Sequence, residues 1–430
     1  MSSTDSAKAT PTVGGEVGVL AATAERAVTG VRAPAAVRAE RRAWLILGLA
    51  FATFCALVFA AFKFAIDYVG SAEVDQSAII TASRGQVAFS LPGSTEKTLL
   101  GSRSDLGVGT VLWLDRTTAA SADLQLFDDT NVKLLAGSTL SLTRMDIGRF
   151  RNQHSVVLTQ ASGPIRYATG DAVDVQVPGA TIHLAGHGDY TVWLVGETTR
   201  VMVYGGEAHV TPDTGGIAVT VPEGTRSDID THGQATRPVE LQDELLSNAD
   251  FSQRDAGWQA IDVPSSALDV NGARSWVDGP TPGTTALRVV RQSVKGEHGE
   301  TGLAQPLNNI DVSGFRHLWL RAWVRVDYAD LSGGGTLNSE YPMMFRVKYE
   351  GPVEGSFVPW AIGLYYSNPD NRPIPPGVAE LWPQGEWKLY EVDLMDTDPA
   401  NVPYRLEEFA VMGQGHSYDA RVAGISLVGE

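Results

Sequence analysis

The chain has 430 residues, of which 33 are Lys or Arg and 50 are Asp or Glu, so its formal net charge is −17 at pH 7. Residues 1–65 carry a net charge of +3, which leaves the rest of the chain near −20 and argues against nucleic acid or anionic lipid as the partner of that larger part. Because Cys55 is the only cysteine, the sequence excludes an intramolecular disulfide and a thiolate metal site.

Residues 43–62 contain no charge and no proline, and they directly follow Arg41 and Arg42. At a helical rise of about 1.5 Å, a segment of this length matches the roughly 30 Å hydrocarbon core of a bilayer. The sequence therefore predicts one transmembrane helix over 43–66. The length of this segment, and the long charged region before it, favour an uncleaved anchor over a cleaved signal peptide.

Positive charge is concentrated before this segment, where arginines stand at positions 26, 32, 38, 41 and 42. Basic residues on one flank of a span tend to stay in the cytoplasm, so we expect the N-terminus inside and the bulk of the chain outside. Residues 1–42 have no aromatic residue and no sustained apolar period, which predicts a disordered cytoplasmic tail. A large exported part without disulfides indicates a bacterial protein, so the predicted location is the bacterial cytoplasmic membrane.

From residue 76 onward, short alternating apolar runs are broken by Gly, Asp, Asn and Pro, as is typical of stacked strands. One such run predicts a hairpin in which Leu124, Leu126, Val132 and Leu134 face the core. The length suits two all-β domains. The predicted fold is therefore mostly β, with a single transmembrane helix followed by two all-β domains.

Residues 76–241 contain an ordered series of short motifs that begins at Gly85-Gln-Val and ends at Val221-Pro-Glu-Gly. On these motifs the first domain, residues 76–241, resembles the β-rich extracytoplasmic domain of the FecR family of bacterial envelope proteins. Thr130 departs from the family's pattern, which usually has Gly there, and so does the His187-Gly188 pair. Regulators of this family inhibit a sigma factor through a longer folded cytoplasmic domain, for which the tail 1–42 offers little. The matching motifs are Gly85-Gln-Val, Ala122-Asp-Leu-Gln-Leu-Phe-Asp-Asp, Gly163-Pro-Ile-Arg-Tyr, Val177-Pro-Gly-Ala-Thr-Ile, Gly188-Asp-Tyr-Thr-Val, Val203-Tyr-Gly-Gly-Glu and Val221-Pro-Glu-Gly.

A short acidic connection, residues 237–247, leads into the second domain, residues 245–430, which opens with Leu245-Leu-Ser-Asn-Ala-Asp-Phe and Gly257-Trp258. On these and later motifs this domain resembles carbohydrate-binding modules with a galactose-binding-like jelly roll. In related modules a structural calcium often uses the opening Asn/Asp loop and an acidic residue before the last strand. Here Arg421-Val-Ala-Gly offers no carboxylate at that position, so we expect no cofactor, and a structural calcium stays open only as the less favoured alternative. The matching motifs are Leu245-Leu-Ser-Asn-Ala-Asp-Phe, Gly257-Trp258, Leu318-Trp-Leu-Arg-Ala-Trp, Met344-Phe-Arg-Val-Lys-Tyr, Gly385-Glu-Trp-Lys-Leu-Tyr and Ala423-Gly-Ile-Ser-Leu.

Catalytic and metal-binding patterns are weak in this sequence. Its carboxylate pairs are adjacent in turns or loops, where solvated charge is the ordinary explanation. His183 and His187 are separated by a strand and turn rather than by one helical turn, and no third ligand is indicated. There is no nucleophile-elbow serine and no phosphate-binding glycine loop. We therefore expect no enzyme activity and no metal site.

Aromatic residues give the strongest indication of a binding surface. Along 317–326, aromatic and arginine residues alternate with aliphatic ones, so one face of a strand presents Trp319, Arg321, Trp323 and Arg325. Exposed Trp rings stack on sugar rings, and Arg donates to hydroxyl groups. The alternative is that the two tryptophans pack beneath a loop with the arginine stems along them. Tyr365, beside a proline-rich loop, is a further candidate that either binds ligand or holds the loop in place.

These features predict a single-pass envelope protein that acts in recognition or scaffolding and binds carbohydrate or another envelope component through its second domain. Two alternatives stay open. In the first, the external part senses a ligand and signals through the span as a FecR-type regulator. In the second, the protein is purely structural and has no ligand.

Overall fold

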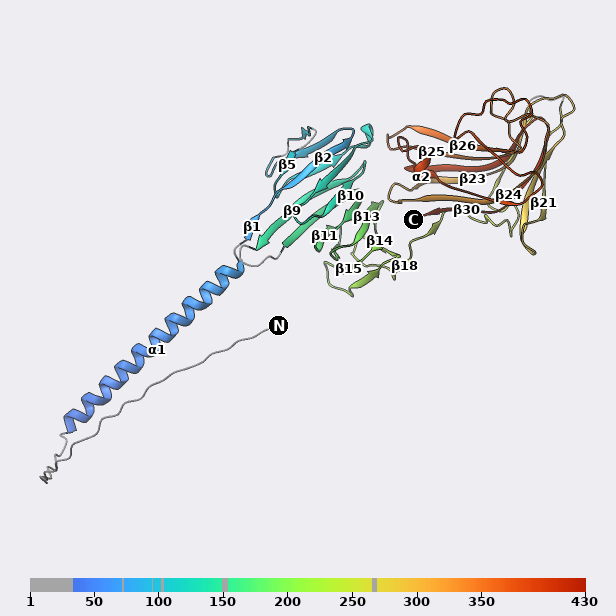
Figure 1. Cartoon of the computed structure of the whole chain (residues 1–430). Helices are drawn as coiled ribbons and strands as arrows, with labels where there is room; N and C mark the ends of the chain where they lie inside the picture. The colour runs from blue at the N-terminus through green and yellow to red at the C-terminus, as the bar shows by residue number, and fades with distance from the viewer. Residues whose placement is uncertain (1–33, 72, 95, 102–103, 149–153, 265–268) are drawn as a thin grey trace, which may run out of the picture. The chain divides into compact units, whose positions relative to one another are not determined.

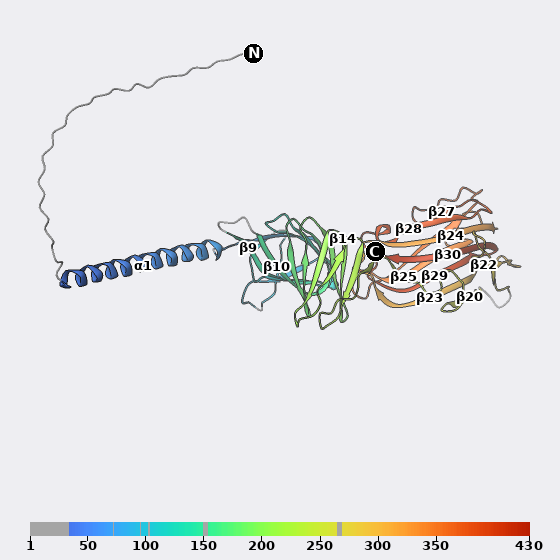
Figure 2. The ribbon, with the colours of Figure 1, turned by 90° about the horizontal axis from the view of Figure 1, so that it is seen from below.

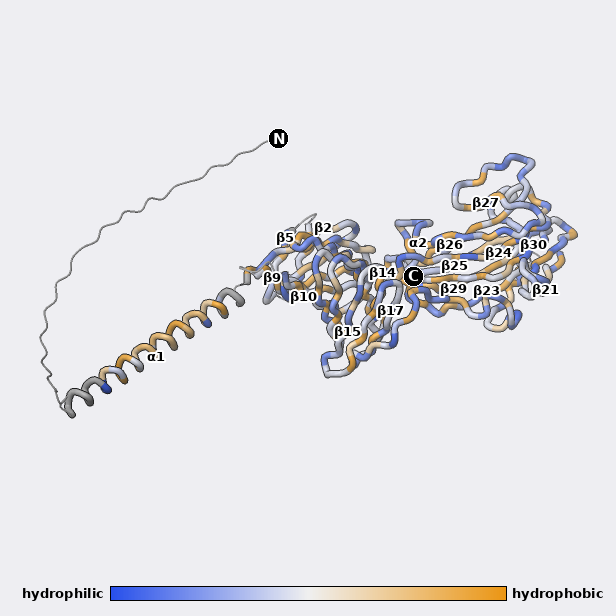
Figure 3. Tube along the Cα trace, turned by 60° about the horizontal axis from the view of Figure 1, so that its bottom comes forward, coloured by the Kyte–Doolittle hydropathy of each residue, from blue (hydrophilic) through white to orange (hydrophobic). Residues whose placement is uncertain are grey.

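The computed structural model describes residues 34–71, 73–94, 96–101, 104–148, 154–264 and 269–430. The predicted disordered tail lies outside this description as far as residue 33. Helix α1 spans Pro34–Ser71, and within it Arg41–Ile66 is long and apolar enough to cross a membrane. All 26 residues of that segment are exposed, and Figure 3 shows the helix mostly in orange, with a blue stretch near its start. The boundary between the two compact units of the chain falls between Val69 and Gly70, near the end of this helix.

Strands β1 to β18 pair around a closed barrel (Figure 1). The long strand β10 belongs to both sheets that make up the barrel. It pairs with β9 and β11 in one sheet and with β8 and β13 in the other. We call this region the barrel. Its elements are β1 (Glu73–Asp75), β2 (Ala78–Arg84), β3 (Val87–Ser90), β4 (Thr98–Leu99), β5 (Ser104–Leu106), β6 (Val111–Leu114), 3-10 helix η1 (Arg116–Thr118), β7 (Ser121–Gln125), β8 (Asn131–Leu134), β9 (Thr139–Gly148), β10 (His154–Ala168), β11 (Val173–Val177), β12 (Ala180–Leu184), β13 (Asp189–Val195), β14 (Thr198–Gly205), β15 (Glu207–Pro212), β16 (Val219–Pro222), β17 (Thr225–Ile229) and β18 (Val239–Glu240).

Strands β19 to β30 form a sandwich of two sheets (Figure 2). One sheet, the β24 sheet, has the order β21-β22-β30-β24-β28, with β19 added on β30, and the other, the β25 sheet, has the order β20-β23-β29-β25-β26-β27. The elements are β19 (Asp243–Glu244), β20 (Gln259–Pro264), β21 (Ala273–Asp278), β22 (Thr285–Arg291), β23 (Gly299–Asp311), β24 (Leu318–Ala329), β25 (Met343–Glu350), β26 (Phe357–Tyr365), β27 (Ala379–Leu381), β28 (Lys388–Asp393), helix α2 (Leu394–Thr397), β29 (Arg405–Gly415) and β30 (Tyr418–Gly429). The expectation of a mostly β chain with one apolar helix is confirmed.

The predicted hairpin is present as β7 and β8, and its four leucine and valine side chains are buried. Thr130 has a specific role at its turn. The Thr130 hydroxyl donates to Asp128 Oδ2 at 3.0 Å and accepts from the backbone N–H of Gly170 at 2.9 Å. Asp129 takes the positive φ of 63° that a glycine usually supplies in such a turn. The Thr130 hydroxyl therefore ties this turn to the loop that contains Gly170.

The connection between the two β regions is short and paired at both ends. β18 pairs with β17 of the barrel, and β19 pairs with β30 of the sandwich. Packing also joins the regions, because Trp193 and Met202 of the barrel belong to the apolar core cluster of the sandwich. Trp193 is only 2% exposed, and its ring meets the ring of Phe315 edge-on at 5.3 Å between centroids. A Cβ on Gly314 would lie 2.2 Å from the Trp193 ring, so glycine is required there.

Candidate functional site

Strand β24 has one buried face and one outward face, as its alternating sequence predicts. Leu318, Leu320, Ala322, Val324 and Val326 are fully buried between the two sheets. The intervening side chains are partly or largely exposed on the outer face of the β24 sheet. The structure thus brings together the four predicted residues Trp319, Arg321, Trp323 and Arg325 on one surface.

Trp323 is the most open of the four, with 40% of its surface exposed. Its cross-strand neighbour on β28 is Leu389, which is 41% exposed. On its other side lies β30, where the chain bulges and Gly424 has a φ of +55°. A Cβ on Gly424 would lie 3.7 Å from Trp323 Cδ1, so the absent side chain leaves that edge of the ring uncovered. Trp323 and Leu389 therefore form a small exposed apolar platform.

Ion pairs surround this platform and hold its charged side chains in fixed positions. Arg321 pairs with Glu391 on β28. Asp327 accepts from Arg325 Nε at 2.7 Å and lies 3.1 Å from Arg421 Nε. Further along the sheet, Arg288 pairs with Asp419, and this hydrogen bond raises the pKa of Arg288 above its ordinary value. Each of these arginines is paired with a carboxylate. The surface therefore presents hydrogen-bonding groups but few unpaired charges.

Trp319 is held more tightly than Trp323. Its indole Nε1 donates to Glu430 Oε1 at 3.1 Å. The His317 ring stacks beside it at 5.9 Å between centroids, and the Arg321 guanidinium lies 5.3 Å from its ring centroid. Trp319 is therefore only partly exposed and acts as a rigid neighbour of the open ring.

Tyr365 lies on the other sheet, so the five predicted residues do not form one surface. It is the last residue of β26 in the β25 sheet, and its ring lies 6.3 Å from that of Tyr341. Tyr341 is fully buried against Gly334 and Gly363, at both of which a Cβ would lie closer than 2.5 Å to its ring. Tyr365 therefore lies beside Tyr341, whose buried ring holds the loop before β25 in place.

Tyr328 was not among the sequence candidates, although it is 46% exposed on the outer face of the β24 sheet. Strict alternation from Leu318 would place Tyr328 inward. A register shift between Val326 and Tyr328 turns it outward, so that it pairs with Asp419. The face therefore carries two exposed aromatic rings on one strand. The sequence gives no direct signal of the bulge.

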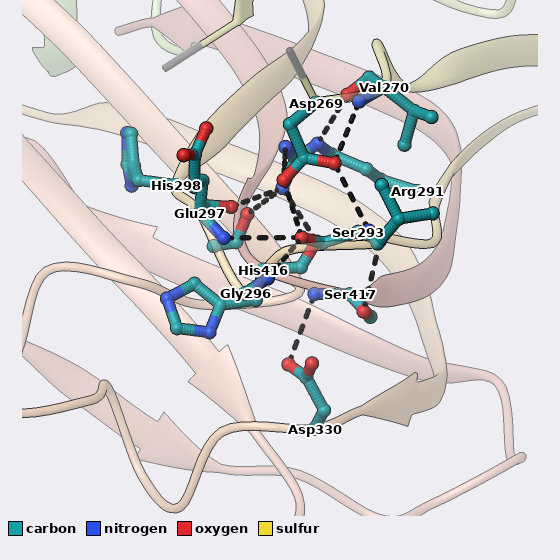
Figure 4. Close-up of polar contacts among 12 residues, drawn as sticks. Asp269, Val270, Arg291, Ser293, Gly296, Glu297, His298, Asp330, His416 and Ser417 are labelled. Carbon is teal, nitrogen blue, oxygen red and sulfur yellow. Dashed lines mark hydrogen bonds and ion pairs between the residues drawn. The ribbon is translucent and has the colours of Figure 1, made fainter. Parts of the chain in front are cut away.

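A different polar centre lies where loops meet at one end of the sandwich, around the buried Arg291 (Figure 4). The Arg291 guanidinium donates to the carbonyls of Val270, Glu297, Gly415 and His416 at 2.6–3.0 Å. It lies 3.3 Å from Asp269 Oδ2, and both side chains are at most 1% exposed.

Asp269 is itself held by the loop that follows β22. Its carboxylate accepts the Ser293 hydroxyl at 2.6 Å and the backbone N–H groups of Val270 and Val294 at 2.7 and 3.0 Å. These bonds, led by that of Ser293, hold the pKa of Asp269 well below its usual range. The centre therefore fixes three loops around an internal cation.

The opening loop of the sandwich is closed by a side chain. The Asn248 amide donates to the carbonyls of Arg254 and Ala256 at 2.8 and 2.9 Å, and its oxygen accepts from the N–H of Gln253 at 2.9 Å. Across the described residues, no group of three or more His, Cys, Asp or Glu side chains is arranged to hold a metal ion. Arg421, near the end of the sandwich, pairs with Asp327.

No protein-family description and no curated protein matches the sequence. Solved structures similar to this chain include a candidate anti-sigma factor from Parabacteroides distasonis, with 13% identity and a TM-score of 0.24 over 35% of this chain. The chain spans 66% of that protein's length, slightly under two thirds. They also include the family 11 carbohydrate-binding module of Clostridium thermocellum in complex with a mixed-linked tetrasaccharide, with 13% identity, 43% and 94% coverage and a TM-score of 0.27. A third is a cellulose-specific module of family 28, with 14% identity, 43% and 93% coverage and a TM-score of 0.25.

Proposed function

We propose that this protein is a single-pass protein of the bacterial cytoplasmic membrane whose external sandwich recognises carbohydrate on the outer face of the β24 sheet. The observation that carries the proposal is the exposed Trp323 ring, which lies beside Leu389 and the uncovered edge at Gly424. An open aromatic ring can stack on the apolar face of a sugar. By analogy with base stacking, such a contact is worth on the order of 1–3 kcal/mol.

The polar surroundings favour a neutral sugar over a charged one. Arg321 and Arg325 are already paired with Glu391 and Asp327, so an anionic ligand would have to compete with carboxylates of the protein. Sugar hydroxyl groups need not displace these carboxylates, because a hydroxyl can donate a hydrogen bond to the carboxylate or accept one from the arginine of an intact ion pair. A sugar chain that extends along β24 from Trp323 would next meet Tyr328, the second exposed ring of this face.

The experiment is a glycan array probed with the full-length protein in lipid nanodiscs, with an empty nanodisc and the Trp323→Ala variant run in parallel. We expect binding to one or a few neutral glycans by the wild-type protein and a loss of that signal for the variant. Binding that is equal for the two proteins would contradict the proposed surface. No binding to any glycan would favour the purely structural alternative.

A second candidate function is signalling across the membrane, and the contacts between the two β regions favour it. Arg200 of the barrel pairs with both Asp228 of the barrel and Asp243 at the start of the sandwich. Arg316 of the sandwich makes two hydrogen bonds to Asp189 of the barrel. A ligand-induced change in the sandwich would therefore act on the barrel, whose first strand begins two residues after α1 ends.

Deletion of residues 2–33 in cells distinguishes the two functions, because it removes most of the cytoplasmic tail and keeps the external part. Signalling predicts that these cells show the same changes in transcription as cells without the gene. Recognition alone predicts that they resemble wild-type cells.

A further inference from the structure

A basic cavity lies between the barrel and the sandwich, in a molecule whose overall charge is strongly negative. Its volume is about 290 Å³. Four cations line it, Arg84, Lys133 and Arg166 from the barrel and Arg316 from the sandwich, against the single carboxylate of Asp396. Lys133, Arg166 and Arg316 also line an adjoining hollow, together with Asp123 and Asp189. Positive charge is therefore gathered here against the trend of the chain.

The strand pairing forces two of these cations together. Lys133 on β8 lies directly opposite Arg166 on β10 in one antiparallel pair, and opposite Asp123 on β7 in the other. Like charges in such positions destabilise a sheet. Burial, together with the third positive charge that Arg316 adds, lowers the pKa of Arg166 below its ordinary value. Asp123 on β7 offsets part of the repulsion at Lys133, and Asp189 is already bound by Arg316.

The hydrogen-bonding capacity of these cations is only partly used. Arg166 donates from one terminal nitrogen to the Phe315 carbonyl at 3.2 Å, while its Nε is buried without a partner. Arg316 binds Asp189 through both terminal nitrogens, and its Nε is likewise buried and unpartnered. Within this group an ion pair joins Arg316 to Asp189, and among the described residues none joins a carboxylate to Lys133 or Arg166.

The remaining walls are mostly apolar. Phe315, Met395, Pro403 and Tyr404 line the cavity together with the aliphatic side chain of Leu135. Burial raises the pKa of Tyr404 to about 12, so this phenol is neutral at physiological pH and adds no negative charge. The cavity therefore combines a cationic side with an uncharged, largely apolar one.

We propose that this cavity binds a small organic anion, in which a carboxylate or phosphate group is carried on a compact apolar body. The anionic group would lie against Lys133 and Arg166, and the apolar body would lie against Phe315 and Tyr404. Such a ligand offsets the repulsion between the cations. Because it would contact both β regions, its binding would also strengthen their association. This site is separate from the aromatic surface of β24.

The test measures thermal unfolding and calorimetric binding of the full-length protein in nanodiscs at low salt. The probes are benzoate, phenyl phosphate and glucuronate, with benzyl alcohol and glucose as uncharged counterparts. We expect at least one anion to bind and to raise the unfolding temperature, and neither neutral probe to do so. Which of the three anions binds shows whether the cavity prefers an aromatic carboxylate, a phosphate ester or an acidic sugar.

Lys133→Gln and Arg166→Gln are the test variants, and Arg237→Gln is the control, because Arg237 is exposed and does not line the cavity. We expect each test substitution to weaken anion binding by about tenfold or more, and the control to leave it unchanged. Lys133 is exposed, so its variant keeps the test valid even if Arg166→Gln unfolds. The proposal is wrong if no anion binds, if neutral probes shift the unfolding temperature equally, or if binding survives both substitutions. Trp323→Ala should leave anion binding intact, which separates this result from the glycan test.

Discussion

At the scale of single residues, Arg291 is the clearest case of a side chain that organises its surroundings. Its guanidinium lies among four backbone carbonyls and the Asp269 carboxylate, all of them oxygen acceptors. An oxygen-lined cage of this type commonly holds a hard cation such as calcium. In this sandwich an arginine supplies the positive charge from within the chain.

The substitution Arg291→Ala should lower the free energy of unfolding by about 3–5 kcal/mol, because it leaves a buried carboxylate and several carbonyls without their partner. Chemical denaturation measures this effect. Arg288→Ala is the control, since Arg288 lies on the same strand in a partly exposed ion pair and should cost about 1 kcal/mol or less. Equal losses for the two variants would contradict the organising role of Arg291.

Asp269 gives a pH dependence with a definite sign. Its pKa in the folded protein lies below its value in the unfolded chain, so its stabilising contribution is fully present above the unfolded pKa of about 3.9. The contribution is lost as the pH falls below that value toward the folded pKa. We therefore expect the difference in melting temperature between wild type and Asp269→Asn to be constant from pH 7 to pH 5 and to shrink below pH 4. A difference that persists unchanged at pH 3 would refute this assignment.

At the scale of strands and turns, regular alternation made much of the fold predictable. β11 spans Val173–Val177, as its alternating valines indicate, and β24 buries every second residue from Leu318 to Val326. Alternation fails where the chain bulges, so Tyr328 was missed. It also says nothing about which strands become neighbours, and for that reason Tyr365 was grouped with a surface on the other sheet.

The basic cavity was beyond sequence analysis for a related reason. Lys133 and Arg166 occupy ordinary outward positions on their strands, and only the pairing of β8 with β10 places them opposite each other. Arg316 comes from a loop of the other β region. The net charge of −17 is a sum over the whole chain, so it gives no indication of a local excess of positive charge.

Strand β13 carries the residue on which the contact between the two β regions depends most. Trp193→Ala should cost about 3–5 kcal/mol, because it opens a cavity against Phe315 and Gly314. It should also split the thermal unfolding of residues 70–430 into two transitions, since the regions then lose much of their shared core. Trp113→Ala, in the barrel and only partly buried beneath Lys97, is the control and should keep one transition. Matching melting curves for the two variants would contradict this prediction.

That residues 245–430 fold as an independent domain stays a prediction. Without the barrel, such a fragment would expose Phe315 and the Gly314 backbone that Trp193 covers in the full chain. Its solubility is therefore a separate question from its ability to fold.

At the scale of the whole molecule, the distribution of charge bears on the orientation in the membrane. Arg41 and Arg42 mark the N-terminal end of the apolar segment, which predicts that the N-terminus is cytoplasmic. Protease added to intact spheroplasts should digest the β regions and spare a tag placed at residue 2. Loss of the tag with survival of the β regions would show the opposite orientation.

The central claim is that the open ring of Trp323 binds carbohydrate, and the affinity of Trp323→Ala for a glycan identified on the array tests it most directly. Calorimetry on the full-length protein should show a roughly ten- to hundred-fold loss of affinity, because one stacking contact is removed. The melting temperature should change little, since the ring is 40% exposed and the buried face of β24 is intact. Phe357→Ala removes a ring that is 61% exposed on the β25 sheet and should leave the affinity unchanged. An unchanged affinity for Trp323→Ala, or a loss explained entirely by unfolding, would contradict the account.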